Sequence, residues 1–107
     1  MAGQPLAERI LSDKLGRRVR PGDFAVVPVD LAYVQDGTGP LTFRQMEAMG
    51  LRRAANPGRT IVFIDHASPP PRKELAADHV FLREVARTHG LVLSDVGGGV
   101  CHQVAFE

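Results

Sequence analysis

The sequence is poor in cysteine and in long apolar runs, and each shortage excludes a class of protein. The single cysteine among 107 residues, Cys101, forms no internal disulfide and belongs to no CxxC pair or Cys/His set that could hold zinc or an iron–sulfur cluster alone. No stretch approaches the roughly 20 apolar residues of a transmembrane helix, and the start lacks a basic segment followed by an apolar run. We therefore expect a protein that is neither exported nor membrane-spanning, with the cytoplasm as its compartment.

An excess of charge of one sign is also lacking. Thirteen Lys and Arg residues against twelve Asp and Glu residues give a net charge of +1, which implies neither a nucleic acid nor a membrane as partner. The 44% hydrophobic and 23% charged residues are typical of a globular domain, and 107 residues can build one core but no deep, fully enclosed active site. We expect a single domain over residues 1–107. If this domain is catalytic, we expect another polypeptide segment to complete its active site.

Hydrophobic spacing and turn residues predict alternating helices and strands. Apolar residues at helical spacing indicate helices over residues 6–15, 41–49 and 72–89, each followed by a glycine that can end it. Apolar runs predict strands over residues 24–29 (with residues 31–34 as an extension), 60–64 and 91–93, and Pro28 restricts the first of these to a sheet edge or a bend. The uninterrupted run over residues 60–64 is typical of a central parallel strand that is buried on both faces.

The order of these elements predicts an α/β fold, a three-layer αβα domain with a mainly parallel sheet. In such open sheets the binding crevice lies outside the carboxyl ends of the strands. Three polar clusters directly follow predicted strands, namely residues 35–39, Asp65 with His66, and residues 97–103. The topology therefore predicts that one edge of the sheet gathers all three into a site.

Two of these clusters suggest specific chemistry. Asp65 beside His66 suits general acid–base catalysis near neutral pH if a turn brings the side chains together; the alternative is a turn aspartate beside a surface histidine. Gln35 and Thr38 offer an amide and a hydroxyl to a carboxylate or phosphate at a helix N-terminus. The alternative is that this loop binds no ligand and serves only as the N-terminal turn of the helix, with Thr38 as the capping residue.

The third cluster and the long helix carry further candidates. The glycines at 97–99 would let the backbone approach a ligand and would bring Cys101 and His102 to the site, although three glycines are also typical of a flexible turn. We interpret Cys101 as a small buried apolar residue rather than a ligand or redox group. His79 and His89 lie on the apolar stripe of the long helix, so we interpret them as buried or helix-terminal residues rather than ligands.

Five ordered segments together carry a family resemblance. They are Leu6-Ala-Glu-Arg-Ile-Leu11, Val27-Pro-Val-Asp-Leu31, Gln35-Asp-Gly-Thr-Gly-Pro40, Phe63-Ile-Asp-His66 and Asp95-Val-Gly-Gly-Gly-Val-Cys-His-Gln-Val104. In this order they resemble the N-terminal part of the aconitase superfamily, most closely the large subunits of 3-isopropylmalate dehydratase and homoaconitase. The resemblance covers nearly the whole chain.

The resemblance implies a hydro-lyase that isomerises a 2-hydroxy di- or tricarboxylate, of the isopropylmalate or homocitrate type, by dehydration and rehydration. A [4Fe–4S] cluster acts as Lewis acid in such enzymes. By residue match, Gln35 would bind a substrate carboxylate, Asp65 and His66 would protonate the leaving hydroxyl, and His102 would assist at that hydroxyl. Thr38, in the same loop as Gln35, is the second substrate-binding candidate.

The chain departs from the family in length and in cysteines. Members have several hundred residues, and their three cluster-binding cysteines lie in segments without a counterpart here; Cys101 matches none of them. We therefore expect no cofactor to be held by this chain alone, a [4Fe–4S] cluster in the full enzyme, and no activity of the chain by itself. The expected partners are the remaining large-subunit segments, a small subunit, a small-molecule 2-hydroxy carboxylate and, through exposed apolar surface, a second copy of the chain.

Two alternatives stay open at this point. One is a non-catalytic dicarboxylate-binding or interaction domain derived from the same family. The other is a mononuclear iron or zinc site built from Asp65, His66 and His102, since two histidines and a carboxylate suit those metals.

Overall fold

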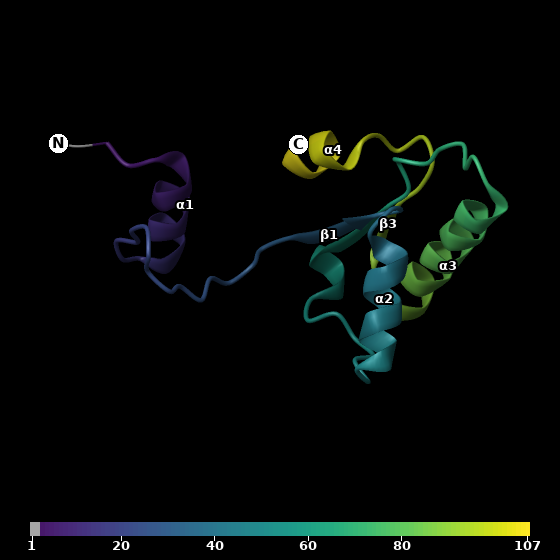
Figure 1. Cartoon of the computed structure of the whole chain (residues 1–107), viewed down its shortest axis with the longest axis horizontal. Helices are drawn as coiled ribbons and strands as arrows, with labels where there is room; N and C mark the ends of the chain where they lie inside the picture. Colours follow the sequence, from purple (N-terminus) through teal and green to yellow (C-terminus); the bar gives the residue numbers. More distant parts are fainter. Residues whose placement is uncertain (1–2) are drawn as a thin grey trace. The chain divides into compact units, whose positions relative to one another are not determined.

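The computed structural model describes residues 3–107, and the chain divides into two compact units, Met1–Asp30 and Leu31–Glu107 (Figure 1). The first unit contains one helix, α1 (Leu6–Leu15), with the predicted bounds. Gly16 ends this helix in the left-handed conformation, at a φ of 66°, as its position predicted. The loop that follows is tied back to the helix, because the backbone N–H of Val19 donates to Ser12 Oγ at 2.9 Å.

The strand predicted over residues 24–29 is wrong. Residues 24–29 have no regular secondary structure, and Phe24 and Val26 are 88% and 76% exposed. An apolar run becomes a strand only when a neighbouring strand accepts and donates its backbone hydrogen bonds, and Pro28 removes one of those donors. The first strand instead begins after the boundary between the two units, within the segment that was predicted as an extension.

The second unit is an α/β fold with a parallel sheet, as predicted. Strands β1 (Ala32–Gln35), β2 (Thr60–Phe63) and β3 (Val92–Ser94) pair in the order β1-β2-β3, with Tyr33 opposite Ile61 and Val62 opposite Leu93. The helices are α2 (Gly39–Ala48), α3 (Lys73–His89) and α4 (Cys101–Phe106), and a 3-10 turn, η1 (Pro57–Arg59), precedes β2. The sequence patterns predicted α2, α3 and all three of these strands to within about two residues, but they predicted neither α4 nor η1.

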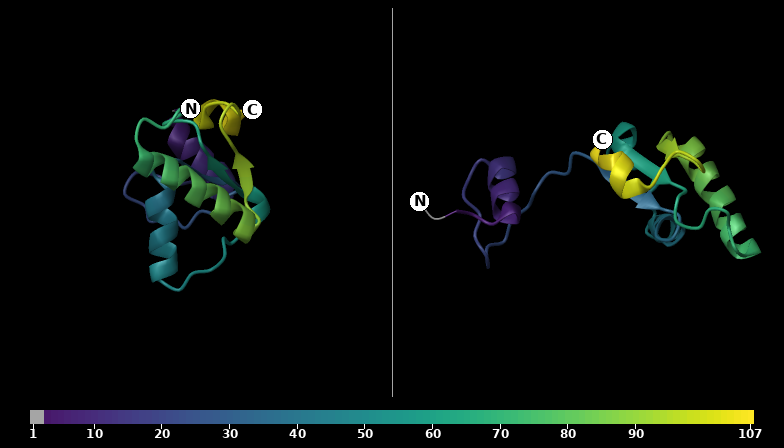
Figure 2. Two further views of the ribbon diagram at one scale, coloured as in Figure 1. Left: turned by 90° about the vertical axis from the view of Figure 1, so that its right-hand side faces the viewer. Right: turned by 90° about the horizontal axis from the view of Figure 1, so that it is seen from above.

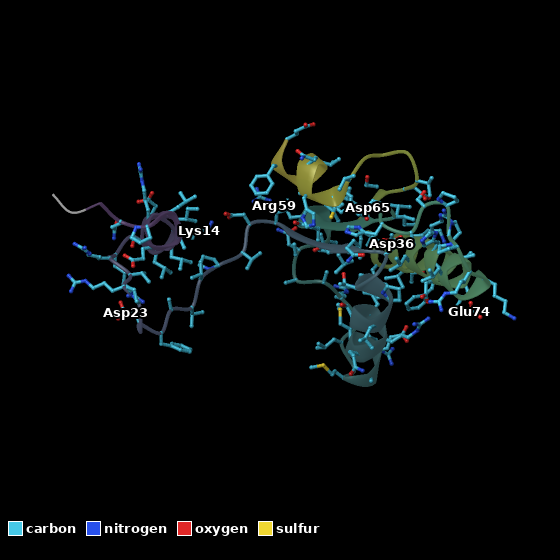
Figure 3. All side chains as sticks on the ribbon, turned by 45° about the horizontal axis from the view of Figure 1, so that its top comes forward. Lys14, Asp23, Asp36, Arg59, Asp65 and Glu74 are labelled. Carbon is cyan, nitrogen blue, oxygen red and sulfur yellow. The ribbon has the colours of Figure 1, made fainter. Side chains whose placement is uncertain are left out.

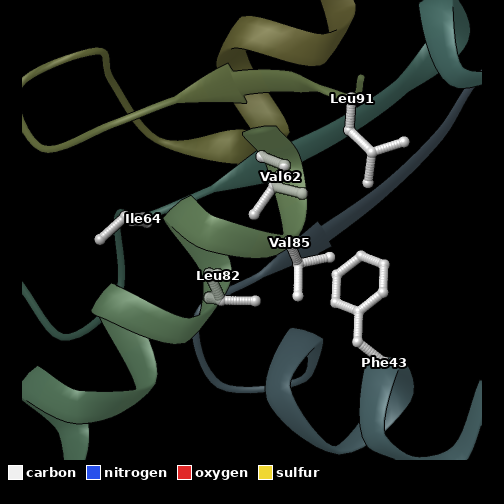
Figure 4. Packing of buried hydrophobic residues seen from close by; sticks show 7 residues of the cluster. Phe43, Val62, Ile64, Leu82, Val85 and Leu91 are labelled. Atoms are coloured by element: carbon white, nitrogen blue, oxygen red, sulfur yellow. The ribbon is translucent and has the colours of Figure 1, made fainter. Parts of the chain in front are cut away.

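The core lies between one face of the sheet and the helices α2 and α3 (Figure 4). Val62 and Ile64 of the central strand and its continuation pack there against Leu82 and Val85 of α3 and Phe43 of α2. Val62, Phe63 and Ile64 are all buried, which confirms that the run over residues 60–64 is covered on both faces. Burial of a large apolar side chain stabilises a fold by about 1.5–3 kcal/mol, so this cluster anchors the strand ends that carry the site.

The opposite face of the sheet is covered in part by the short helix α4 (Figure 2). Phe63 points to this face and meets the ring of Tyr33 edge-on, with centroids 5.6 Å apart. Tyr33 in turn contacts His102 of α4, and Cys101 at the start of α4 is fully buried. This helix forms the third layer and returns the end of the chain to the sheet. Among residues 3–107, no helix is long and apolar enough to cross a membrane.

Gly39 is the point of closest approach between α2 and the core. A Cβ atom on Gly39 would lie 2.8 Å from Leu82 Cδ2 and 3.2 Å from Val34 Cγ2, and Leu82 is fully buried. We therefore expect Gly39→Ala to lower the free energy of unfolding by about 1–3 kcal/mol, as overpacked cores do. Urea denaturation measures this. The control is Gly58→Ala, whose Cβ would meet only Asn56 Oδ1 at 3.8 Å; an equal loss in both variants would contradict the packing argument.

Candidate functional site

The polar clusters that follow β1 and β2 meet at the carboxyl edge of the sheet. Asp36 directly follows β1, and Asp65 lies two residues beyond the end of β2. Figure 3 shows both carboxylates close to each other beside the loop that leads to α4. The segment that contains Cys101 and His102 joins them there, because the backbone N–H of Cys101 donates to Asp65 Oδ2 at 2.6 Å. The structure thus brings together all three polar clusters at one edge.

Asp36 is the buried centre of this edge. Its side chain is 1% exposed; Oδ1 accepts the backbone N–H of His66 at 3.0 Å, and Oδ2 accepts that of Ala67 at 2.8 Å. The Nε2 of buried His79 on α3 lies 3.0 Å from Oδ2. Burial alone would raise the pKa of Asp36, but the hydrogen bonds from Ala67, His66 and His79 lower it below its usual value. Asp36 therefore stays ionised and ties the loop after β2 to β1 and α3.

Asp65 and His66 form the ion pair that the acid–base hypothesis requires. The chain turns after Asp65, so His66 Nδ1 lies 2.8 Å from Asp65 Oδ1. The Asp65 side chain is 2% exposed, whereas that of His66 is 43% exposed. The hydrogen bond to Asp65 is the main cause that raises the pKa of His66. Burial would raise the pKa of Asp65, but its bonds with His66 and Cys101 lower it. The pair is thus a buried carboxylate that holds an accessible imidazole.

His102 faces the same space from α4. Its ring lies 6.1 Å from the His66 ring, centroid to centroid, and its Nδ1 lies 3.2 Å from the hydroxyl of Tyr33. Cys101 is fully buried, as predicted, and burial together with Asp65 raises the pKa of its thiol. His66, in the turn after β2, and His102, on α4, therefore lie close together. The Nδ1 of His66 lies beside an Asp65 oxygen, and the Nδ1 of His102 lies beside the Tyr33 hydroxyl.

Gln35 and Thr38 lie at the end of β1, where the chain turns into α2. The Gln35 side chain folds back so that its Oε1 accepts the backbone N–H of Gly37, and a Cβ on Gly37 would lie 2.8 Å from that oxygen. This leaves the amide Nε2 of Gln35 as a donor. The prediction that the Thr38 side chain caps α2 is wrong. Its hydroxyl instead bonds the backbone of Gln35, because the residue adopts a helical rather than an extended backbone.

A shallow cleft of about 270 Å³ opens beside Asp65. Its lining includes Ser68 after the His66 turn and Gly97 and Gly99 of the loop before α4. Both glycines have a positive φ, which supports the turn interpretation of this loop, and they expose backbone to the cleft. Sites for small molecules commonly enclose about 300–1,000 Å³, so this cleft is smaller than a typical binding site.

The groups able to hold a metal differ from the predicted trio. Within residues 3–107, ligand atoms lie within 4.8 Å of one another in two sets: His66, Cys101 and His102, and Asp36, Asp65 and His66. Asp65 does not join His66 and His102, because its oxygens face His66 Nδ1 and the Cys101 N–H. A [4Fe–4S] cluster needs several cysteine thiolates, and the chain has one cysteine, so its residues do not fit that cofactor.

Sequence reasoning missed two residues of this edge. Asp36 was part of a turn-rich loop, and nothing in its neighbours indicates that its carboxylate becomes the buried partner of His79, 43 residues away. His79 was correctly interpreted as a buried structural residue. Tyr33 gave no signal, because a strand tyrosine is ordinarily a packing residue. Its contact with His102 joins residues 69 positions apart, which only the packing of α4 on the sheet produces.

The chain is similar in sequence to curated proteins of known name, although no protein-family model matches it. The chain is 53% identical over 104 residues to the 3-isopropylmalate dehydratase large subunit of Elusimicrobium minutum. It is 41% identical over 105 residues to large subunit 1 of the same enzyme from Thermotoga maritima, and 42% identical over 105 residues to the homoaconitase large subunit of Thermus thermophilus. These matches cover 97–98% of this chain and 25% of each relative, so the chain spans about a quarter of their length. The resemblance inferred from the five motifs is confirmed.

Proposed function

We propose, on the premise that the chain is homologous to a segment of the 3-isopropylmalate dehydratase and homoaconitase large subunits, that it supplies the acid–base wall of a hydro-lyase site. The substrate would be a 2-hydroxy di- or tricarboxylate of the isopropylmalate or homocitrate type. The observation that carries the proposal is the Asp65–His66 pair, in which Asp65 Oδ1 and His66 Nδ1 lie 2.8 Å apart. Asp65 lines an open cleft, and the ring of His102 lies beside that of His66. We place this activity in the cytoplasm.

His66 is the proton donor in this proposal. Its Nδ1 is held by the buried carboxylate of Asp65, so the opposite ring nitrogen, Nε2, is free to meet a substrate hydroxyl. Asp65 favours the protonated imidazole, which can transfer its proton to the hydroxyl as the C–O bond breaks and water leaves. Asp36 positions His66 by accepting the hydrogen bond from its backbone N–H. In the hydration direction the same nitrogen takes the proton back.

His102 and Gln35 orient the substrate around that proton transfer. The Tyr33 hydroxyl beside His102 Nδ1 fixes the ring, so its Nε2 can bond the same substrate hydroxyl. Gln35 offers its amide N–H to a substrate carboxylate at the start of α2, where the helix dipole also favours an anion, and Thr38 lies in the same turn. These contacts fix which hydroxyl faces His66.

The rest of the site would come from other polypeptide. The cleft is open, and we assign no residue of the described edge to removal of the carbon-bound proton of the substrate. We place that base, the cysteines for a [4Fe–4S] cluster and the second substrate-facing wall in the remaining large-subunit segments and a small subunit. Large exposed apolar side chains, including Phe24 and Phe106, are surfaces that such partners could cover.

Anaerobic purification from native cells tests this proposal. The intact masses of co-purifying polypeptides, iron and sulfide content, and dehydration of isopropylmalate and homocitrate would be measured on the same sample. We expect this chain in a larger polypeptide or complex that contains iron and sulfide and dehydrates one of these acids. A bare 11.6 kDa species without metal and without activity would contradict it.

A dicarboxylate-binding module is the second candidate function, and the single cysteine of the chain favours it. In that case the isolated chain binds malate or citrate by itself. We expect Gln35→Ala to weaken that affinity about tenfold, because it removes one hydrogen bond to a charged group. Calorimetric titration measures the affinity, with Gln103→Ala as the control, since Gln103 is an exposed amide on α4. An unchanged affinity in Gln35→Ala would contradict this role of Gln35.

A further inference from the structure

The side chains of His66, Cys101 and His102 converge near the carboxyl edge of the sheet. One potential ligand atom from each lies within 4.8 Å of the other two. The residues come from two separate segments, the turn after β2 and the start of α4, and the hydrogen bond from the Cys101 backbone to Asp65 joins those segments. The cluster is therefore a product of the tertiary fold rather than of a local sequence motif.

Both histidines are already oriented as metal ligands usually are. A ligating histidine typically donates its second ring N–H to a carboxylate or another oxygen, which fixes the tautomer and strengthens the ligand. His66 Nδ1 lies 2.8 Å from buried Asp65, and His102 Nδ1 lies 3.2 Å from the Tyr33 hydroxyl. When each Nδ1 donates to its oxygen, each Nε2 presents a lone pair. Two oriented imidazoles thus share one space with a thiol.

We infer that His66, Cys101 and His102 form a binding site for a single divalent cation of the zinc type. Two imidazoles and a thiolate are ligands that Zn²⁺ prefers, and three protein ligands leave the fourth tetrahedral position open. Such a site needs ligand atoms about 3.3–3.6 Å apart, given the usual Zn–N and Zn–S lengths. The two histidines are exposed, and their ring nitrogens need to move only slightly toward the buried thiol of Cys101, because the three ligand atoms already lie within 4.8 Å of one another. The ion binds the Cys101 thiolate, and the thiol proton passes to solvent.

The second set of potential ligands fits an ion less well. Both oxygens of Asp36 already accept backbone N–H groups, and one also meets His79. Asp65 is likewise occupied on both oxygens, by His66 and by the Cys101 N–H. A cation there would have to displace several buried hydrogen bonds. The site containing Cys101 requires a small adjustment of two exposed rings and the loss of the Cys101 thiol proton.

The cation site goes beyond the proposed function and does not depend on it. An ion on His66 Nε2 would occupy the nitrogen that the proposed hydro-lyase uses to transfer a proton. Zn²⁺ would therefore compete with the acid–base role of His66 rather than assist it. Because the site is made wholly by this chain, binding can be measured without activity, so failure of the one proposal is distinct from failure of the other.

Titration of the metal-free full chain with Co²⁺ tests the inference. We expect one equivalent to bind, with the visible bands of a tetrahedral site and a thiolate-to-cobalt charge-transfer band, and Zn²⁺ to displace it. Cys101→Ser should abolish the charge-transfer band, and His66→Asn and His102→Asn should each weaken binding more than about 100-fold. Tyr33→Phe should weaken it about tenfold, as loss of a group that orients a ligand does.

His89→Asn is the matched control, since His89 lies at the end of α3 and outside the cluster. It should leave cobalt affinity unchanged. Circular dichroism of each variant checks its fold, and exposed His102→Asn keeps the test decisive if Cys101→Ser does not fold. Absence of binding, or binding whose spectrum lacks a sulfur band and is insensitive to His102→Asn, would overturn the inference.

Discussion

Replacing Asp36 with alanine is expected to lower the free energy of unfolding by about 3–5 kcal/mol, because it breaks a hydrogen-bond network around a buried carboxylate. Asp36 accepts the N–H groups of His66 and Ala67 and contacts His79, which is itself buried. Its removal leaves these donors buried without a partner, and it disconnects the loop after β2 from β1 and α3. Urea denaturation followed by circular dichroism measures the loss.

The matched control for this prediction is Asp78→Ala on the same unit. Asp78 pairs with Arg44 at 3.1 Å on the surface, where such pairs contribute less than about 1 kcal/mol. Equal destabilisation by the two substitutions would show that Asp36 is no more important than a surface carboxylate. The same buried position explains why Asp36 matters to the site without touching the cleft itself.

If the chain acts in a hydro-lyase as proposed, His66→Asn is expected to reduce kcat for dehydration about 10²–10⁴-fold, the usual contribution of a positioned general acid. Asparagine keeps the polar character of the position but supplies no proton at neutral pH. The substrate carboxylate contacts assigned to Gln35 are unaffected, so KM should change little. Steady-state kinetics measures both constants. His89→Asn is the control, and full activity of His66→Asn would reject the assignment of His66 as proton donor.

The proposed acid–base role of Asp65 and His66 also predicts a pH dependence of the dehydration rate. Because Asp65 raises the pKa of His66, the protonated imidazole persists to higher pH, and the dehydration rate falls only as pH rises through that pKa. Asp65→Asn removes the main cause of the raised pKa, so the falling limb should move to lower pH. The pH dependence of kcat, measured for the unsubstituted protein and for Asp65→Asn, tests this. If the pH at which kcat falls is the same in both, a group other than His66 controls the fall.

Local patterns were sufficient for the elements that have a regular helical stripe or an uninterrupted apolar run. The apolar run over residues 60–64 predicted the central strand. The helical stripe followed by Gly90 predicted α3. Both signals are local, because they depend only on side-chain periodicity and on a glycine that can end a helix. The strand expected over residues 24–29 failed for the converse reason. Apolar character alone forms no strand without a neighbour, and no strand pairs with this segment. The short helix α4 has no apolar period long enough to be recognised.

The order of elements along the chain also predicted where the polar clusters would gather. Parallel strands end at the same edge, so polar residues after β1 and β2 had to meet the loop before α4 in space. This topological rule, together with adjacent Asp65 and His66, was enough to nominate the acid–base pair. The roles of Asp65, His66, His102, Gln35 and Thr38 in catalysis and substrate binding stay predictions.

The sequence by itself thus determined the α/β fold, the family resemblance and the edge at which the polar clusters gather, since each depends on local periodicity or on ordered motifs. Only the tertiary structure decided which atoms meet there: Asp36 with His79, Tyr33 with His102, and His66 with Cys101 and His102. These contacts join residues 35 to 69 positions apart. The physical reason is that hydrogen-bond partners and metal-ligand sets are fixed by distances of a few ångströms, and those distances are set by how α3 and α4 pack on the sheet.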